Sequence, residues 1–209
     1  MSVQISYNKK LSSKNSVNKV LFIDEKYKIS DLKKHLFPAE FKCISDLLKS
    51  KDIKEKILSF EISSKVKVTL VSVKKDIKSS DLENLGAKFY DIFKSSKIKD
   101  FNLNSDTAPK HKNDVVGYFL HGIKLKSYKF DKYKTKKLNE NLSIIVTGKN
   151  KPSIKNQIKF KAIEDGIFYA RDLVSEPGNV LHPDEYAKRI NSLRNDGLRI
   201  NIYDEKKLK

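Results

Sequence analysis

The chain has 209 residues, of which 38% are hydrophobic, and a formal net charge of +18. Its length predicts one or two domains with a globular core. The single cysteine excludes an internal disulfide, the N-terminus lacks the apolar core of a signal peptide, and no apolar run approaches the roughly 18 residues of a membrane span. We therefore expect a soluble, cytoplasmic protein with no membrane partner.

The positive charge comes almost entirely from lysine, because the four arginines all lie beyond residue 170. Arginine suits bidentate contacts with phosphates and bases, whereas lysine is a hydrated point charge. Two explanations of the lysine excess stay open. One is an AT-rich coding sequence, which also favours Ile, Asn, Tyr and Phe. The other is a surface that binds a polyanion.

Strand and helix patterns alternate through the first part of the chain. Alternating apolar residues predict a half-buried strand over 3–7, and a continuous apolar run predicts a strand covered on both faces at 20–23. Apolar residues at helical spacing predict a helix over 38–49, and a strand pair follows at 57–62 and 66–73.

The same alternation continues to residue 147. Ser80 and Glu83 form a capping-box pattern, S-x-x-E, which predicts the start of a helix. The inner face of this helix is expected to consist of Leu82, Leu85, Phe89, Ile92 and Phe93. A strand at 100–103, a helix capped by Asp114 and a β-branched strand at 142–147 follow. This order predicts an α/β fold, a mixed sheet flanked by helices.

A polar stretch at 148–153 separates this domain from a long helix over 154–175, which at about 1.5 Å per residue spans roughly 33 Å. Its predicted inner stripe is Ile163, Ile167, Ala170 and Val174. The helix ends before Pro177, Pro183 begins the next helix, and alternating apolar residues predict a strand at 198–203.

These elements divide the chain into three expected parts. Residues 1–150 form an N-terminal α/β domain, and 151–177 form a connector helix. Residues 178–209 form the incomplete, truncated start of a second α/β domain.

Residue types that carry chemistry are sparse. The four histidines lack ligand spacing, which argues against a zinc site: His35, His111, His121 and His182. A metal clip of His182, Asp184 and Glu185 is one alternative, but acidic residues in a helix's first turn also complement its dipole. No phosphate-loop, dinucleotide-binding or nucleophile-elbow motif is present. Cys43 is expected at the edge of a buried helix face, not as a nucleophile. We therefore assign no catalytic, cofactor-binding or metal-binding residue.

Residues 170–189 read ARDLVSEPGNVLHPDEYAKR. This stretch resembles the segment by which cytosolic leucyl aminopeptidases of the dimetal family enter their catalytic domain, A-R-x-L-x-N-x-P-x-N-x-x-T-P. Six positions agree: Ala170, Arg171, Leu173, Pro177, Asn179 and Pro183. Two differ, since Ser175 replaces the usual Asn and His182 the usual Thr. The resemblance implies a structural turn at the domain entry, formed by Glu176, Pro177, Asn179 and Pro183.

Residues 122–137 read GIKLKSYKFDKYKTKK and resemble a second segment of the same family, G-x-x-L-x-x-Y-x-F-x-x-Y-K-x-K. Basic residues around aromatic rings can bind single-stranded nucleic acid. The candidate nucleic-acid contacts are Lys126, Tyr128, Lys129, Lys132, Tyr133 and Lys134. The alternative is a solvated loop whose aromatic rings fasten it to the domain.

The resemblance covers the chain well from about residue 80 onward. It implies a macro-domain-like N-terminal sheet, peptide substrates with N-terminal leucine preferred, a homo-hexamer, and two divalent metal ions, manganese or zinc, in the parent enzyme. The family's metal-bearing motifs, K-G-x-x-F-D-x-G-G and N-x-x-x-A-E-G-R, are absent from these 209 residues. We therefore expect the catalytic residues beyond the chain's end, and no bound metal or peptidase activity for this stretch alone.

Two other functions stay open. Some bacterial members of the family also bind DNA, so the chain could be a DNA-binding or regulatory module without peptidase activity. A small-molecule pocket in the sheet, such as one for a nucleotide, is the third.

Overall fold

The computed structural model of the chain describes residues 3–7, 18–49, 55–64, 66–110, 114–136 and 141–208. The chain forms two compact units, Met1–Glu164 and Asp165–Lys209. Within the described residues, no helix is both long enough and apolar enough to cross a bilayer.

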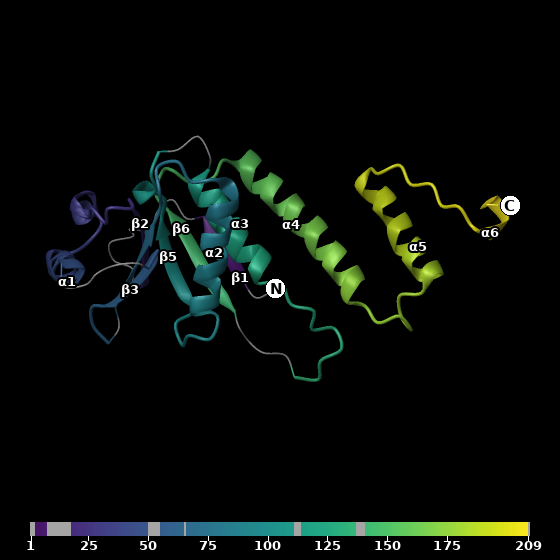
Figure 1. Cartoon of the computed structure of the whole chain (residues 1–209), viewed down its shortest axis with the longest axis horizontal. Coiled ribbons are helices and arrows are strands. Elements are labelled where there is room, and N and C mark those ends of the chain that lie inside the picture. Colours follow the sequence, from purple (N-terminus) through teal and green to yellow (C-terminus); the bar gives the residue numbers. More distant parts are fainter. Residues whose placement is uncertain are drawn as a thin grey trace. The chain divides into compact units, whose positions relative to one another are not determined.

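The first unit is built on a six-stranded sheet with the strand order β1-β6-β5-β2-β4-β3 (Figure 1). The strands are β1 (Val3–Tyr7), β2 (Asn18–Ile23), β3 (Ile57–Glu61), β4 (Lys67–Ser72), β5 (Asp100–Asn104) and β6 (Leu142–Thr147). Neighbouring strands are parallel except β3 and β4, which are antiparallel. Too few residues separate β3 from β4 for the crossover that a parallel pair needs. The predicted mixed sheet is confirmed.

Helices cover both faces of this sheet. On one face lie α2 (Ser79–Phe93) and α3 (Val115–Lys126), and on the other lies α1 (Pro38–Lys49). The next helix along the chain, α4 (Ile154–Ser175), begins in the first unit and ends in the second, to which α5 (Pro183–Ser192) and α6 (Glu205–Leu208) belong. Short 3₁₀ helices are η2 (Ser30–Lys34), η3 (Ser105–Thr107) and η4 (Leu193–Asp196). The bounds of α1 and α4 coincide with the predicted helices.

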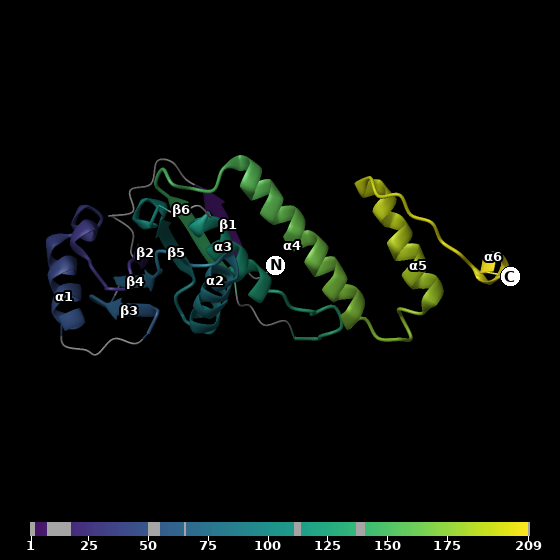
Figure 2. The same ribbon diagram turned by 45° about the horizontal axis from the view of Figure 1, so that its top comes forward.

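Alternating side chains of β2 supply two separate hydrophobic cores. Val20 and Phe22 pack with α2 and α3, whereas Leu21 and Ile23 pack with α1 and η2. In Figure 2, α1 lies beside β3 and β4, while α2 and α3 lie together over the other part of the sheet. A strand buried on both faces explains why its sequence is a continuous apolar run.

Two glycines bring α2 and α3 into close contact. A Cβ atom at Gly86 would overlap the carbonyl oxygen of Phe119, and one at Gly122 would overlap the carbonyl oxygen of Glu83. The backbones approach closely because neither residue carries a side chain. The ring of Phe119 then packs edge-on against Phe89 at a centroid distance of 5.6 Å.

The predicted capping box of α2 is wrong. The helix begins at Ser79, and its N-cap residue, Lys78, makes no side-chain cap hydrogen bond. Ser80 therefore lies inside the first turn, where it cannot act as the cap. Glu83 faces α3 instead, with its Oε1 3.8 Å from Nε2 of His121. Ile92, predicted on the inner face, is 52% exposed.

Two buried polar contacts fasten helices within the first unit. Under α1, the Lys19 ammonium donates to Glu40 Oε2 at 2.7 Å, and both residues are buried. In the middle of α4, Oε1 of Glu164 lies 3.1 Å from Nδ1 of His121, and the imidazole ring is 5.0 Å from the ring of Phe160. Buried polar groups are tolerated when they have a partner of this kind.

The predicted inner stripe of α4 is not its buried face. Ile163 and Val174 are 39% and 87% exposed, whereas the buried side chains of α4 are Phe160 and Glu164. Residues 198–203 form no strand. A strand needs a neighbour for its backbone hydrogen bonds, and the described part of the second unit supplies none. Gly197 adopts a left-handed conformation after η4, with φ of 86°.

Because of the glycine contacts between α2 and α3, we expect two glycine-to-alanine substitutions to change the free energy of unfolding in opposite directions. Gly122→Ala should destabilise the protein by about 1–3 kcal/mol, because the added methyl group overpacks a backbone contact. Gly166→Ala is the control, since a Cβ at Gly166 in α4 meets nothing within 4 Å. It should stabilise by about 0.5–1 kcal/mol through helix propensity. Urea unfolding followed by circular dichroism measures both changes, and equal effects would contradict the close contact.

Candidate functional site at the turn between α4 and α5

Of the predicted turn residues, Glu176, Pro177 and Asn179 lie between α4 and α5, and Pro183 is the first residue of α5. All four belong to the second unit. Pro177 cannot continue α4, because its ring removes a backbone donor and clashes with the preceding turn. Its carbonyl oxygen accepts hydrogen bonds from the amides of Val180 and Leu181, each at 2.9 Å. Pro183 lies in the first turn of α5, where its missing N–H needs no partner.

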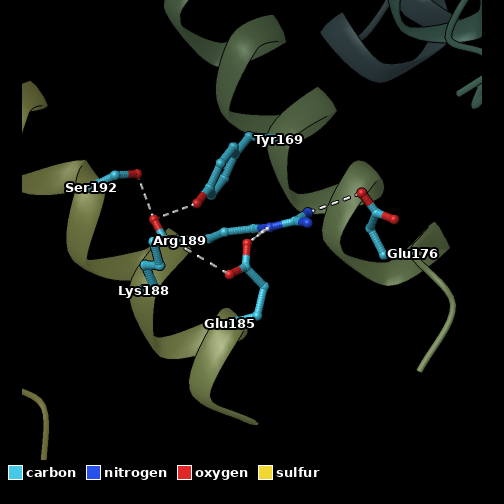
Figure 3. Close-up of polar contacts among 6 residues, drawn as sticks. All are labelled: Tyr169, Glu176, Glu185, Lys188, Arg189 and Ser192. Atoms are coloured by element: carbon cyan, nitrogen blue, oxygen red, sulfur yellow. Dashed lines mark hydrogen bonds and ion pairs between the residues drawn. The ribbon is translucent and has the colours of Figure 1, made fainter. Parts of the chain in front are cut away.

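Arg189 of α5 holds this turn through its guanidinium group (Figure 3). Nη1 donates to Oε1 of Glu176 at 3.0 Å, and Nε donates to Oε1 of Glu185 at 3.0 Å. The Glu176 side chain is only 2% exposed. Burying a carboxylate is costly unless it is paired and hydrogen-bonded, and Arg189 supplies such a partner from α5.

The backbone of Arg189 completes the cluster. Its carbonyl oxygen accepts hydrogen bonds from the Tyr169 hydroxyl at 2.7 Å and the Ser192 hydroxyl at 2.6 Å (Figure 3). Tyr169 belongs to α4, so side-chain and main-chain atoms of one residue contact α4, the turn and α5. We call Tyr169, Glu176, Glu185 and Arg189 the Arg189 cluster.

The charges in the Arg189 cluster reinforce each other. Hydrogen bonds to Glu185 and Glu176 raise the pKa of Arg189, and the hydrogen bond from Arg189 lowers the pKa of Glu185 below its ordinary 4.5. A carboxylate with a lowered pKa contributes stability above its ordinary pKa and loses it as the pH falls through the lowered value. The turn is therefore held at neutral pH and weakened by acid.

The described residues contain no metal centre. No group of three or more His, Cys, Asp or Glu side chains lies close enough to hold an ion in the described part of the chain. The alternative clip of His182, Asp184 and Glu185 is therefore not formed, and Glu185 pairs with Arg189 instead. The arrangement positions two helices and offers no donor set for chemistry.

The histidines occupy separate surroundings. Nδ1 of His35 lies 2.8 Å from Nδ2 of Asn104, and burial lowers the pKa of His35. His121 contacts Glu164, His182 precedes α5 as its N-cap residue, and His111 lies outside the described residues. Cys43 is half-buried beside the fully buried Ile44, as its position in the helix predicts.

We call residues 122–137 the basic aromatic segment. Its described part, residues 122–136, lies at the end of α3 and in the loop after it. Two of its lysines are paired with aspartates: Lys126 with Asp91 at 3.1 Å, and Lys134 with Asp131 at 3.3 Å. The Lys132 ammonium lies 5.6 Å from the centre of the Tyr133 ring, which is 52% exposed. The other two candidate contacts, Tyr128 and Lys129, are half-buried. The six candidate contacts are near neighbours in the sequence, and their binding of nucleic acid stays a prediction.

From the sequence, Glu176 is predicted as a turn residue and Glu185 as part of a metal clip or a complement to the helix dipole, whereas Tyr169 and Arg189 are assigned no role. The spacing of Glu185 and Arg189, four residues apart on a helix, is a readable signal for an ion pair. Nothing local links Tyr169 or Glu176 to Arg189, because those contacts form only when α5 packs beside the end of α4.

No protein-family model matches the chain. A probable cytosol aminopeptidase of Methylorubrum populi is 40% identical over 101 residues, which is 46% of this chain and 20% of that protein. The probable cytosol aminopeptidase of Nitrobacter hamburgensis is 43% identical over 100 residues, 44% of this chain and 20% of its own length. The chain is homologous to the cytosol aminopeptidases.

Solved structures agree on the fold. A mutant of tomato leucine aminopeptidase superposes on 99% of this chain and 45% of its own chain, with a TM-score of 0.69 and 18% identity. The bottromycin maturation enzyme BotP covers 92% of this chain and 40% of its own, with a TM-score of 0.64 and 15% identity. The matched stretch spans about a fifth of the length of the cytosol aminopeptidases. The similarity therefore concerns only that part of those proteins.

The Arg189 cluster predicts a local loss of order when the guanidinium is removed. Arg189→Met removes the guanidinium that bonds the buried Glu176 carboxylate and Glu185, so backbone amides of α5 should exchange with deuterium faster than in the unaltered chain. Lys188→Met is the matched control, because Lys188 is 83% exposed and only 4.0 Å from Glu185. Hydrogen exchange measured by mass spectrometry compares the protection of the α5 amides in the two variants. Identical protection would contradict a stabilising role for Arg189.

Proposed function

We propose that this chain is the N-terminal portion of a cytosol aminopeptidase, an exopeptidase that releases N-terminal amino acids, leucine preferentially, from peptides. The observation that carries the proposal is the 40% identity to cytosol aminopeptidases over 101 residues. It is supported by the match of 99% of this chain to the fold of tomato leucine aminopeptidase. In the proposed layout, residues 1–150 are the N-terminal domain, 151–177 the connector and 178–209 the start of the catalytic domain.

The proposed parent enzyme depends on two divalent metal ions, manganese or zinc, which would polarise the peptide carbonyl and supply a nucleophile. One relative by fold, BotP, is known in complex with manganese. The described residues of this chain do not fit such a centre, because they hold no carboxylate or histidine cluster. We therefore assign the metal ligands to the part of the enzyme that this chain does not match, and no catalytic step to the residues described.

The role proposed for this chain is to position the catalytic domain. The Arg189 cluster joins the end of α4 to α5 through contacts of 2.7–3.0 Å, and Glu176, Pro177, Asn179 and Pro183 would shape the entry. The homo-hexamer and the cytoplasmic location belong to the same proposal.

A chimera tests the proposal. In it, this chain replaces the corresponding stretch of the Methylorubrum populi cytosol aminopeptidase, and release of p-nitroaniline from leucine p-nitroanilide is measured with Mn²⁺ or Zn²⁺. We expect metal-dependent hydrolysis by the chimera and none by the 209-residue chain alone. A folded, metal-loaded chimera without activity would refute the proposal, and so would metal-dependent hydrolysis by the isolated chain.

Arg189→Met in that chimera separates positioning from folding. Small misplacements of catalytic groups cost up to about 10²-fold in rate, so kcat should fall by roughly one to two orders of magnitude. Lys188→Met should leave kcat unchanged. Equal kcat values for the two variants, with both chimeras folded, would show that the cluster does not position the catalytic domain.

A second function, binding of DNA, rests on the exposed Tyr133 ring beside Lys132 in a chain of net charge +18. If the lysines bind phosphates, log affinity should fall linearly with log salt, with a slope of about −0.7 per phosphate for single strands. Fluorescence anisotropy with a labelled oligonucleotide measures the slope. Lys132→Gln should make this slope shallower by the amount that corresponds to one phosphate contact. Lys28→Gln, outside the basic aromatic segment, should leave the slope unchanged.

Absence of binding at about 50 mM salt, where counterion release favours association most strongly, would remove this second function. Binding that Lys132→Gln and Lys28→Gln weaken equally would place the interaction outside the basic aromatic segment.

A further inference from the structure

A cavity of about 250 Å³ opens where the chain leaves β5 and β6. Residues 108–110 follow β5 and η3, residues 114–116 begin α3, and Asn150 follows β6. Parallel α/β sheets bind ligands outside the carboxyl ends of their strands. The volume is just below the roughly 300–1,000 Å³ of pockets for drug-sized ligands, so the cavity suits a smaller molecule.

Two side chains of opposite charge line this cavity. The Asp114 carboxylate is held in place because the Gly117 amide donates to its Oδ1 at 2.7 Å and the Asn156 side chain donates to its Oδ2 at 2.9 Å. Each carboxylate oxygen can still accept a further hydrogen bond. Lys110 is exposed at the same cavity. Within the described part of the chain, no cation pairs with Asp114 and no carboxylate pairs with Lys110.

The remaining lining is largely apolar. Val115 and Val116 are buried, and Ala108 and Pro109 are half-buried. A ligand that satisfies the whole lining needs an ammonium for Asp114, a carboxylate for Lys110 and a short apolar group for the valines.

We infer that this cavity binds a free apolar α-amino acid. Its ammonium group faces Asp114, its carboxylate faces Lys110, and its side chain packs on Val115 and Val116. The inference rests on the proposed function in one respect: an amino acid of this class is what the proposed enzyme releases, so the ligand is a product of its reaction.

A phosphate-bearing ligand fits this place poorly. The amides of Lys149 and Asn150 after β6 already donate to Oδ1 of Asp106, at 2.6 and 3.3 Å. An internal carboxylate thus occupies the donors that a phosphate would use, and the negative charge of Asp114 repels a second anion. This argues against the nucleotide pocket considered from the sequence.

Titration of the ¹⁵N-labelled full chain with L-leucine, followed by amide NMR shifts, tests the inference. We expect saturable shifts centred on residues 108–110, 114–117 and 150. L-leucinamide lacks the carboxylate and N-acetyl-L-leucine lacks the ammonium, so each should bind about tenfold or more weakly, as expected for the loss of one charged hydrogen bond. Glycine lacks the apolar side chain and should also bind more weakly than leucine.

Matched variants locate the site. Lys110→Gln should weaken leucine binding by about tenfold, whereas Lys149→Gln makes the same charge change outside the cavity lining and should not. Asp114→Asn removes the charge but keeps a residue that caps helices equally well, so it should lose leucine binding while α3 stays folded.

Three results would overturn the inference. The first is no saturable shift up to roughly 50 mM leucine, a concentration far above a millimolar Kd. The second is equal binding of leucine, leucinamide and acetyl-leucine, and the third is equal binding of leucine by the Lys110 and Lys149 variants. The outcome is independent of the chimera's activity, because binding is measured on this chain without catalysis. Leucine binding with an inactive chimera would refute only the proposed function.

Discussion

The ion pair between Arg189 and the buried Glu176 carboxylate joins the two helices of the second unit. The Glu176 side chain is 2% exposed and follows the last residue of α4, one residue before Pro177. Burying a carboxylate is costly unless it is paired and hydrogen-bonded. Arg189 reaches it from the next helix at 3.0 Å, and the Tyr169 hydroxyl fixes the same residue from α4. Proline ends the first helix, and the ion pair then sets where the second one lies.

Two buried polar pairs have a similar role in the first unit. Lys19 and Glu40 are buried together between the sheet and α1, and His121 and Glu164 are buried together between α3 and the middle of α4. Each pair joins a helix to an element distant in sequence. The glycines at 86 and 122 add a steric requirement, because only residues without a Cβ allow α2 and α3 to approach so closely. Polar pairing and close backbone contact thus position helices that apolar burial alone would leave free to slide.

Much of this fold could be predicted from the sequence, because its signals are local. The period of apolar residues marks the strands, Asp114 caps α3 as expected, and Pro177 and Pro183 mark the turn between α4 and α5. Predictions failed where tertiary contacts compete with local rules. Glu83 faces His121 instead of capping its own helix, and the apolar stripe containing Ile163 and Val174 stays exposed while Phe160 is buried. The partners of Arg189 and the strand order could not be read from spacing, since both depend on which distant elements pack together.

Sequencing the coding region past Lys209 is the decisive experiment on whether this chain is the front part of a cytosol aminopeptidase. We expect the reading frame to continue into a catalytic domain with the K-G-x-x-F-D-x-G-G and N-x-x-x-A-E-G-R motifs, to which the family resemblance assigns the metal ligands. A genuine stop codon directly after Lys209 would contradict it.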